Sequence, residues 1–233
     1  MNYLPPVIAI DGPSGSGKGT VSRRVAEALG WHLMDSGALY RVLAWVSHEA
    51  GVTSAEPQKL QSLAVNLQVE FRHTASGDER ILLGGRDITD SVRSEDCGNW
   101  ASELAVIPQV REGLRTVQRS FRQPPGLVAD GRDMGTVIFP DAGLKIFLTA
   151  SAEERAKRRY NQLKEKGLDA NLPTLFRDIA ARDTRDQSRA VSPLKPAPEA
   201  VVLDSTDLGV EEVVVKVLVL ARALFGDRAG RDG

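Results

Sequence analysis

The stretch 12-GPSGSGKGT-20 decides the fold class of this chain. Its glycines let the backbone curl so that several N–H groups point inward toward one anion. An apolar run at residues 7–11 precedes it and predicts a buried strand, and helical spacing of apolar residues follows from Lys18. A strand, a glycine-rich loop and a helix in this order predict a phosphate-binding loop. The helix N-terminus attracts the anion, and Lys18 reaches its outer phosphates.

The loop departs at one position from the common pattern G-x-x-x-x-G-K-[ST]. Gly19 stands where serine or threonine is expected, and Thr20 follows one residue later. This variant is typical of nucleoside-monophosphate kinases. It also displaces the Thr20 hydroxyl, our candidate Mg²⁺ ligand, by one position. The residues expected to contact the nucleotide phosphates are Gly12, Pro13, Ser14, Gly15, Ser16, Gly17, Lys18, Gly19 and Thr20.

Strand and helix patterns alternate on both sides of a central interruption. The expected strands are residues 7–11, 31–34, 127–130, 145–149 and 200–204, and the expected helices are residues 18–29, 37–50, 108–122, 151–166, 174–189 and 210–225. This alternation predicts an α/β fold of three layers, in which helices cover both faces of a central parallel sheet.

The interruption is a local antiparallel hairpin. Val69, Phe71 and His73 alternate with polar residues, a turn follows at 76–78, and residues 80–83 form the return strand. We therefore expect a small inserted lobe. The expected division is a core of residues 1–59 and 96–226, an inserted lobe of residues 60–95, and a disordered tail of residues 227–233.

Composition excludes several classes of protein. The chain has 30 basic and 31 acidic residues, a net charge of −1 that argues against a nucleic-acid partner. Cys97 is the only cysteine, so an internal disulfide is excluded, and the three histidines show no metal-site spacing. No window approaches the roughly 20 apolar residues of a membrane span. We expect a cytoplasmic monomer that binds small molecules, and neither nucleic acid nor membranes.

Two motifs predict a second anion site beside the loop. In 35-DSGALYR-41, Ser36 and Arg41 follow a strand, at the edge where open α/β sheets bind ligands. In 130-DGRDMGTVIFPDA-142, Asp130 is placed to hold the water shell of Mg²⁺, and Arg132 to clamp a phosphate with two N–H groups. Asp133 is placed to accept a hydrogen bond from the amino group of a base.

Arginines gather on the helices expected near residues 151–189. Arg155, Arg158 and Arg159 share one helix face, which is either a solvated surface or a lid at residues 153–168 that closes over phosphates. The spacing of Arg182, Asp186 and Arg189, four residues and then three, makes their side chains converge.

Taken together, GPSGSGKGT, DSGALYR, ADGRDMGTVIFPDA, SAEERAKRR and RDTRDQSRAVSP resemble the bacterial cytidylate kinases, in the same order and from about Val7 to Phe225. The resemblance implies a P-loop fold with an inserted monophosphate-binding lobe and a helical lid. It implies transfer of a phosphoryl group from ATP, with Mg²⁺, to CMP and dCMP.

The resemblance also implies roles for individual residues. Residues 12–20 bind the ATP phosphates, and Arg41 and Arg132 hold the CMP phosphate. The cytosine contacts are Ser36, Arg111, Asp133 and Arg189, and the ribose contacts are Ser102, Arg182 and Asp186. The residues expected to act in catalysis are Lys18, Arg132, Arg155 and Arg158, and those expected at the metal are Thr20 and Asp130.

Three alternatives stay open at this point. The first is a kinase of another small acceptor, such as UMP, AMP or a sugar acid, against which the GRDMGT and RDxRDxxRA segments argue. The second is a GTP-dependent switch, although no NKxD segment for reading guanine is present. The third is a nucleic-acid-binding P-loop protein, which the balanced charge disfavours.

Overall fold

The computed structural model describes residues 4–73, 79–165 and 167–226. The chain divides into two compact units, of which the second is Leu33–Arg122 and the first is the remainder, Met1–His32 with Gln123–Gly233. The expected tail at 227–233 and the expected turn at 76–78 lie outside the described residues.

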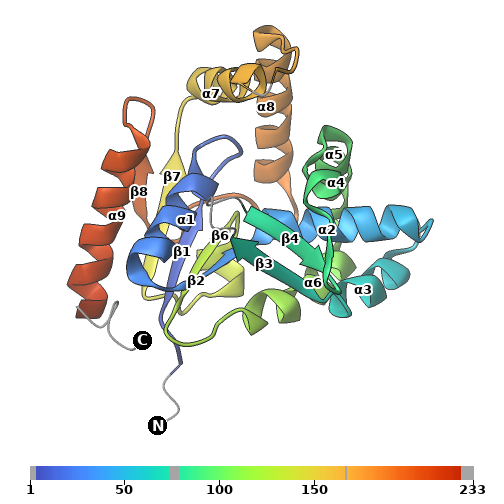
Figure 1. Cartoon of the computed structure of the whole chain (residues 1–233), viewed down its shortest axis with the longest axis horizontal. Coiled ribbons are helices and arrows are strands. Elements are labelled where there is room, and N and C mark those ends of the chain that lie inside the picture. The colour runs from blue at the N-terminus through green and yellow to red at the C-terminus, as the bar shows by residue number, and fades with distance from the viewer. Residues whose placement is uncertain (1–3, 74–78, 166, 227–233) are drawn as a thin grey trace. The chain divides into compact units, whose positions relative to one another are not determined.

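A parallel sheet forms the centre of the first unit (Figure 1). Its order is β2-β6-β1-β7-β8, and β2 is the strand on which the chain passes into the second unit. The strands are β1 (Val7–Asp11), β2 (His32–Asp35), β6 (Leu127–Gly131), β7 (Leu144–Thr149) and β8 (Val201–Asp204). All five residues of β1 are buried, as a strand covered on both faces requires. The predicted α/β fold with a central parallel sheet is confirmed.

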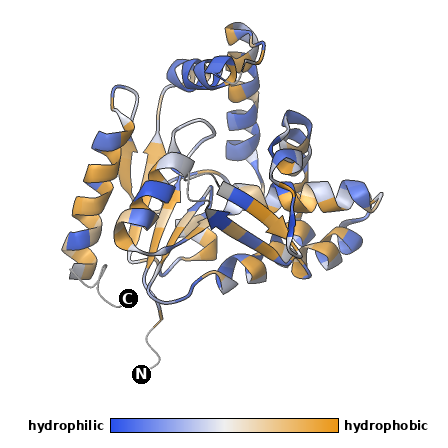
Figure 2. Ribbon diagram, in the orientation of Figure 1, coloured by the Kyte–Doolittle hydropathy of each residue, from blue (hydrophilic) through white to orange (hydrophobic). Residues whose placement is uncertain are grey.

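Two helices of the first unit pack against this sheet, α1 (Lys18–Leu29) and α9 (Val210–Phe225). The other elements are α7 (Ala152–Glu165) and α8 (Leu172–Ser188), which pack on each other, and a short π-helical turn, η1 (Met134–Ile138), after β6. Gly30 ends α1 in the left-handed conformation at φ 65°, as its position after the apolar pattern predicts. Figure 2 shows apolar central strands, whereas α7 and α8, which pack on each other, are largely hydrophilic.

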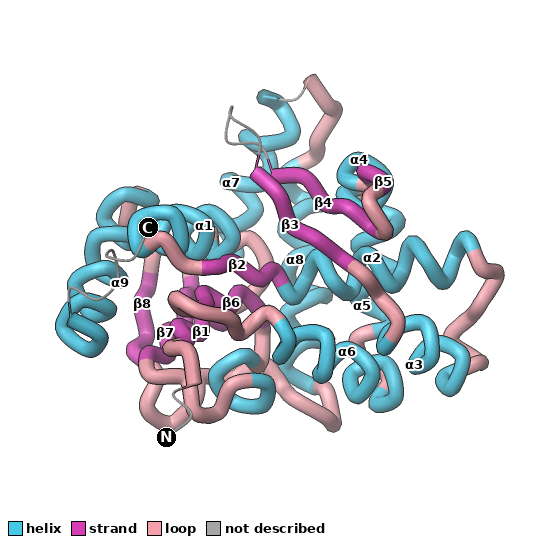
Figure 3. The backbone as a smooth tube through the Cα atoms, turned by 60° about the horizontal axis from the view of Figure 1, so that its bottom comes forward, coloured by secondary structure: helices cyan, strands magenta, loops and turns pink. Residues whose placement is uncertain are grey.

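The second unit combines helices with a small antiparallel sheet of order β3-β4-β5 (Figure 3). Its elements are α2 (Ser36–Glu49), α3 (Pro57–Val65), β3 (Val69–His73), β4 (Glu79–Leu83), β5 (Arg86–Asp87), α4 (Thr89–Arg93), α5 (Glu95–Leu104) and α6 (Pro108–Ser120). The predicted hairpin is confirmed, with Phe71 opposite Ile81. The unit extends beyond residues 60–95, because α2 packs on α3, α4 and α5, α6 packs on α3, and α4 contacts β4 of the hairpin. The assignment of 60–95 as a separate lobe stays a prediction.

Close packing of α3 on α6 holds part of this second unit together. A Cβ added to Gly113 would lie only 2.8 Å from the Ala64 Cβ, so glycine sets the distance between the two helices. Among the described residues, no helix is long and apolar enough to cross a membrane.

Candidate functional site

The register of the sheet brings the two main motifs of the first unit to the same edge. β1 pairs with β6 in parallel, so that Ile10 lies opposite Asp130 and Asp11 opposite Gly131. The glycine-rich loop leaves β1 at Gly12, and the Asp130–Asp133 segment leaves β6, at neighbouring strand ends. Since ligands of open α/β sheets bind at the carboxyl ends of the strands, both motifs occupy the expected position.

Backbone sterics explain the glycines of the loop. Gly12 has φ 152°, and a Cβ there would lie 2.0 Å from the carbonyl oxygen of Leu148 on β7. Gly17 has φ 90° and immediately precedes α1. The Lys18 side chain is buried, and its Nζ donates to the Pro13 carbonyl at 2.8 Å, across the loop. This places the ammonium group over the curve of the loop at the positive end of α1.

Asp11 links the loop strand to the segment after β6, and sequence reasoning missed it. Its carboxylate accepts hydrogen bonds from the backbone N–H groups of Met134 and Gly135, both at 2.8 Å. Burial raises the pKa of Asp11 to about 6, and the charge of Asp133 acts in the same direction, while the two N–H groups and Lys18 oppose the rise. The available signal was an acid that ends an otherwise apolar strand.

The candidate metal position lies beside the first turn of α1. A Cβ on Gly19 would lie 3.5 Å from Oδ2 of Asp130, so the Asp130 carboxylate faces the turn that carries Thr20. Carboxylate and hydroxyl oxygens with room for water suit Mg²⁺. The described residues contain no cluster of three or more His, Cys, Asp or Glu side chains that could hold a metal by themselves.

The buried carboxylate of Asp186 bonds to two of the arginines predicted to bind the acceptor. Asp186 is 1% exposed; it accepts from Nε of Arg132 at 3.0 Å and from Arg189 through the other oxygen. Burial opposes its ionisation, but the charges of Arg132, Arg189 and Arg182 outweigh that effect and lower its pKa. The predicted convergence of Arg182, Asp186 and Arg189 is confirmed, and Arg132 joins it. Asp133, at the start of η1, is also buried.

Arg155 is held at every nitrogen of its guanidinium. Nε donates to the Ala150 carbonyl and Nη1 to the Ser14 carbonyl of the loop, both at 3.0 Å, while both Nη atoms bond to the Asp183 carboxylate. The residue is 4% exposed. Arg155 therefore ties α7 to α8 and to the loop in this structure, and its expected catalytic role stays a prediction.

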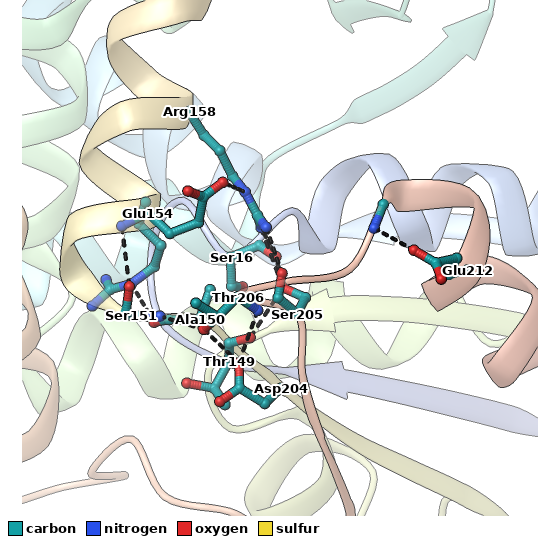
Figure 4. A network of polar contacts seen from close by, with 12 residues as sticks. Ser16, Thr149, Ala150, Ser151, Glu154, Arg158, Asp204, Ser205, Thr206 and Glu212 are labelled. Atoms are coloured by element: carbon teal, nitrogen blue, oxygen red, sulfur yellow. Dashed lines mark hydrogen bonds and ion pairs between the residues drawn. The ribbon is translucent and has the colours of Figure 1, made fainter.

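Arg158 lies one helical turn further along, and its side chain has different partners (Figure 4). Its Nε donates to Glu154 at 3.0 Å, its Nη1 to Ser205 Oγ at 3.2 Å, and its Nη2 to the Ser205 carbonyl at 2.5 Å. The Ser205 hydroxyl also lies 3.3 Å from the Ser16 carbonyl of the loop and 3.0 Å from that of Thr149. Sequence reasoning missed Ser205, whose only signal was a polar turn after β8.

In the second unit, Arg41 is fixed from α2 onto the segment before α5. Its Nη1 donates to the carbonyls of Val92 and Ser94, both at 2.9 Å. Gly98 on α5 makes room for the guanidinium, since a Cβ there would lie 2.4 Å from Arg41 Nη2. Two helices thus hold a cation that the sequence assigned to a phosphate.

The other predicted residues of the second unit are buried polar groups. Ser36 is the first residue of α2, and its Oγ accepts from Gln118 Nε2 at 2.8 Å. Arg111 on α6 donates to the Ala105 carbonyl at 3.1 Å. Ser102 is buried on α5, and its Oγ has no hydrogen-bond partner among the described residues. Since buried polar groups are normally hydrogen-bonded, the unbonded Ser102 hydroxyl requires an explanation, and contact with a ligand is one.

The predicted residues therefore fall into two groups, one in each unit. The first unit brings together the loop, Asp130, Arg132, Asp133, Arg155, Arg158 and the Asp186 cluster. The second unit carries Ser36, Arg41, Ser102 and Arg111. That the two groups face a common pair of nucleotides stays a prediction.

Comparison with known proteins assigns the family. The model of the family described as cytidylate kinase matches residues 8–223. The chain belongs to the cytidylate kinase family. The cytidylate kinase of Azotobacter vinelandii is 55% identical over 229 residues, which cover 97% of this chain and 100% of the relative. The resemblance seen in the sequence motifs is confirmed.

Two further relatives agree over similar lengths. The cytidylate kinase of Pseudomonas syringae pv. tomato is 56% identical over 219 residues, covering 94% of this chain and 96% of the relative. That of Colwellia psychrerythraea is 54% identical over 221 residues, covering 95% and 98%. Membership of this kinase family means nucleotide substrates and a nucleotide phosphoryl donor.

Proposed function

We propose that this chain transfers the γ-phosphoryl group of ATP to CMP and dCMP, which yields ADP and the cytidine diphosphate. The observation that carries the proposal is the β1–β6 register, which sets the glycine-rich loop beside Asp130 and Arg132. Family membership names the acceptor, because the full-length relatives are cytidylate kinases. We further propose that the enzyme acts as a monomer in the cytoplasm, without nucleic acid or membrane partners.

The donor is held by the loop. Backbone N–H groups within residues 12–20, apart from Pro13, and the N-terminus of α1 bind the ATP phosphates. Lys18 exchanges its bond to the Pro13 carbonyl for oxygens of the outer phosphates. Thr20 and Asp130 would hold Mg²⁺, directly or through water, and the ion supplies positive charge to the donor phosphates. The Asp130 carboxylate beside the first turn of α1 fits this hard, oxygen-seeking ion.

The acceptor phosphate is held by Arg41 and Arg132. One of its oxygens attacks the γ-phosphorus, a new phosphorus–oxygen bond forms, and the bond between the γ-phosphorus and the bridging oxygen breaks to release ADP. The attacking oxygen is already an anion near neutral pH, so the reaction needs no general base. The barrier is mainly electrostatic, and Lys18 and Arg158 lower it by neutralising charge on the transferred group.

The base is selected by hydrogen-bond polarity. The Asp133 carboxylate suits the N4 amino donor of cytosine, arginine suits the O2 acceptor, and a donor such as arginine or a serine hydroxyl suits N3. Uracil would set an oxygen lone pair against Asp133, which costs roughly 1–3 kcal/mol, or about 5- to 150-fold in specificity.

An acceptor panel tests this function. ADP formation is followed with ATP and Mg²⁺ against CMP, dCMP, UMP, AMP and GMP, with the Lys18→Ala variant as the control for contaminating kinases. We expect the highest kcat/KM for CMP and a collapse of activity in the variant. A higher kcat/KM for another monophosphate would show that Asp133 does not read the cytosine amine.

A further inference from the structure

A buried glutamine on α6 contacts a residue expected to read the base. Gln118 is 1% exposed, and its Nε2 donates to Ser36 Oγ at 2.8 Å. Its other amide atom, Oε1, is buried without a hydrogen-bond partner in the part of the chain that the structure describes. Because a buried amide is unfavourable unless its groups are bonded, packing alone does not explain a glutamine at this position.

The two helices present matching pairs of side chains. Ser36 and Tyr40 are one turn apart on α2, and Arg111 and Gln118 are two turns apart on α6. Gln118 meets Ser36, and the Arg111 guanidinium lies 6.0 Å from the centre of the Tyr40 ring. One face of α6 therefore carries Arg111 and Gln118. Arg111 is itself expected to contact cytosine, and Gln118 bonds to Ser36, which is also expected to contact cytosine.

The bond fixes the polarity of the Ser36 hydroxyl. A hydroxyl has one proton to donate and two lone pairs that accept. Since Gln118 Nε2 occupies one lone pair, the Ser36 proton points away from Gln118 and is available to another acceptor. A carboxylate at position 118 would reverse the polarity, because the Ser36 proton would then be donated to it.

We propose that Gln118 is a positioning residue that holds the Ser36 hydroxyl as a hydrogen-bond donor to the ring nitrogen N3 of the cytosine acceptor. This role rests on the proposed function, since it presupposes that CMP is the acceptor. Cytosine N3 is an acceptor, whereas uracil N3 carries a proton. Gln118 therefore contributes to selectivity for CMP without contacting the reacting phosphates.

Two variants of similar side-chain size test the proposal. Gln118→Met removes the donor without adding charge, and Gln118→Glu replaces the donor with an acceptor. Each is compared with the wild type for the KM of CMP and UMP, for kcat, and for CMP binding by calorimetry. Gln58→Glu, an exposed substitution on α3 with the same change of charge, is the matched control. Thermal unfolding verifies that each variant is folded. If Gln118→Glu does not fold, the result for Gln118→Met alone tests the proposal.

We expect Gln118→Met to raise the KM and the dissociation constant of CMP about 3- to 10-fold, as the loss of one hydrogen bond predicts, with kcat within about 2-fold of the wild type. Gln118→Glu should raise the KM and the dissociation constant of CMP further, and should lower the ratio of kcat/KM for CMP to that for UMP. In a Ser36→Ala background, neither substitution should have a further effect on CMP.

The possible results distinguish a failure of the proposed kinase function from a failure of the role assigned to Gln118. A wild type that does not phosphorylate CMP would refute the proposed function, and the role of Gln118 would fall with it. An active wild type whose Gln118 variants keep the KM for CMP within about 2-fold would overturn the positioning role alone. The same holds if Gln118→Met has an undiminished effect when Ser36 is already alanine.

Discussion

Replacing Gly98 with alanine should weaken CMP binding while leaving the fold almost as stable. Gly98 is buried on α5, and a Cβ there would lie 2.4 Å from Nη2 and 2.8 Å from Cζ of Arg41. The guanidinium is otherwise held at 2.9 Å by the carbonyls of Val92 and Ser94. Since ordinary van der Waals contact begins at 3.4 Å, the added methyl group displaces the guanidinium by about 1 Å.

The displacement of Arg41 and the higher helix propensity of alanine have opposite effects on the free energy of unfolding. The displaced atoms are the far end of a flexible side chain, so the fold can absorb the shift, and alanine gains about 1 kcal/mol over glycine inside a helix. We therefore expect the free energy of unfolding to change by less than about 1 kcal/mol. A charge-assisted hydrogen bond to the CMP phosphate is worth about 1.5–3 kcal/mol, so its loss should raise the KM for CMP about 10- to 150-fold.

Steady-state kinetics and urea unfolding measure the two effects separately, and the KM for ATP serves as an internal control. In an Arg41→Ala background, Gly98→Ala should no longer raise the KM for CMP and should stabilise the protein by up to about 1 kcal/mol, because only the helix propensity remains. The reasoning is refuted if Gly98→Ala leaves the KM for CMP unchanged, or if it destabilises the fold by several kcal/mol.

The remaining predictions concern the first unit. Arg155→Ala should destabilise the protein by about 3–5 kcal/mol in urea unfolding, because it leaves the Asp183 carboxylate and two carbonyls without their buried partner. Arg158 is more exposed, so Arg158→Ala should lower the free energy of unfolding by less than about 1 kcal/mol. Equal losses of unfolding free energy in the two variants would contradict this difference. Lys18→Ala and Arg158→Ala should lower kcat far more than they raise KM, and the opposite kinetic pattern would remove both from catalysis. Asp11 has a pKa of about 6 when folded and 3.8 otherwise, so the folded state binds more protons between these values. The free energy of unfolding should accordingly fall by about 3 kcal/mol as the pH rises from about 4 to above 6, and a wild type and an Asp11→Asn variant with the same pH dependence of unfolding would refute this.

Elements with a strong periodic pattern were predicted from the sequence almost to the residue. β1 and α9 match their expected bounds, Val7–Asp11 and Val210–Phe225, because apolar runs and helical spacing are local signals. Three helices, α3, α4 and α5, were missed. α3 and α4 are short, and α5 contains Gly98, which disfavours a helix locally but leaves space for the Arg41 guanidinium.

The site was predictable where its geometry is local. The spacing of Arg182, Asp186 and Arg189 along one helix was enough to predict their convergence. The hydrogen-bond partners of Asp11 and Gln118 were not predictable, because they lie 123 and 82 residues away in the sequence. Such pairs depend on strand register and on the packing of helices, which spacing within one motif does not determine.

The central claim is that the γ-phosphoryl group of ATP passes to a cytosine monophosphate. The direct measurement is a competition in which ATP labelled at the γ-phosphate is incubated with the protein, Mg²⁺ and equal concentrations of CMP and UMP. The label should appear in CDP about 5- to 150-fold faster than in UDP. Equal labelling of the two diphosphates, or label found only in inorganic phosphate, would contradict the account.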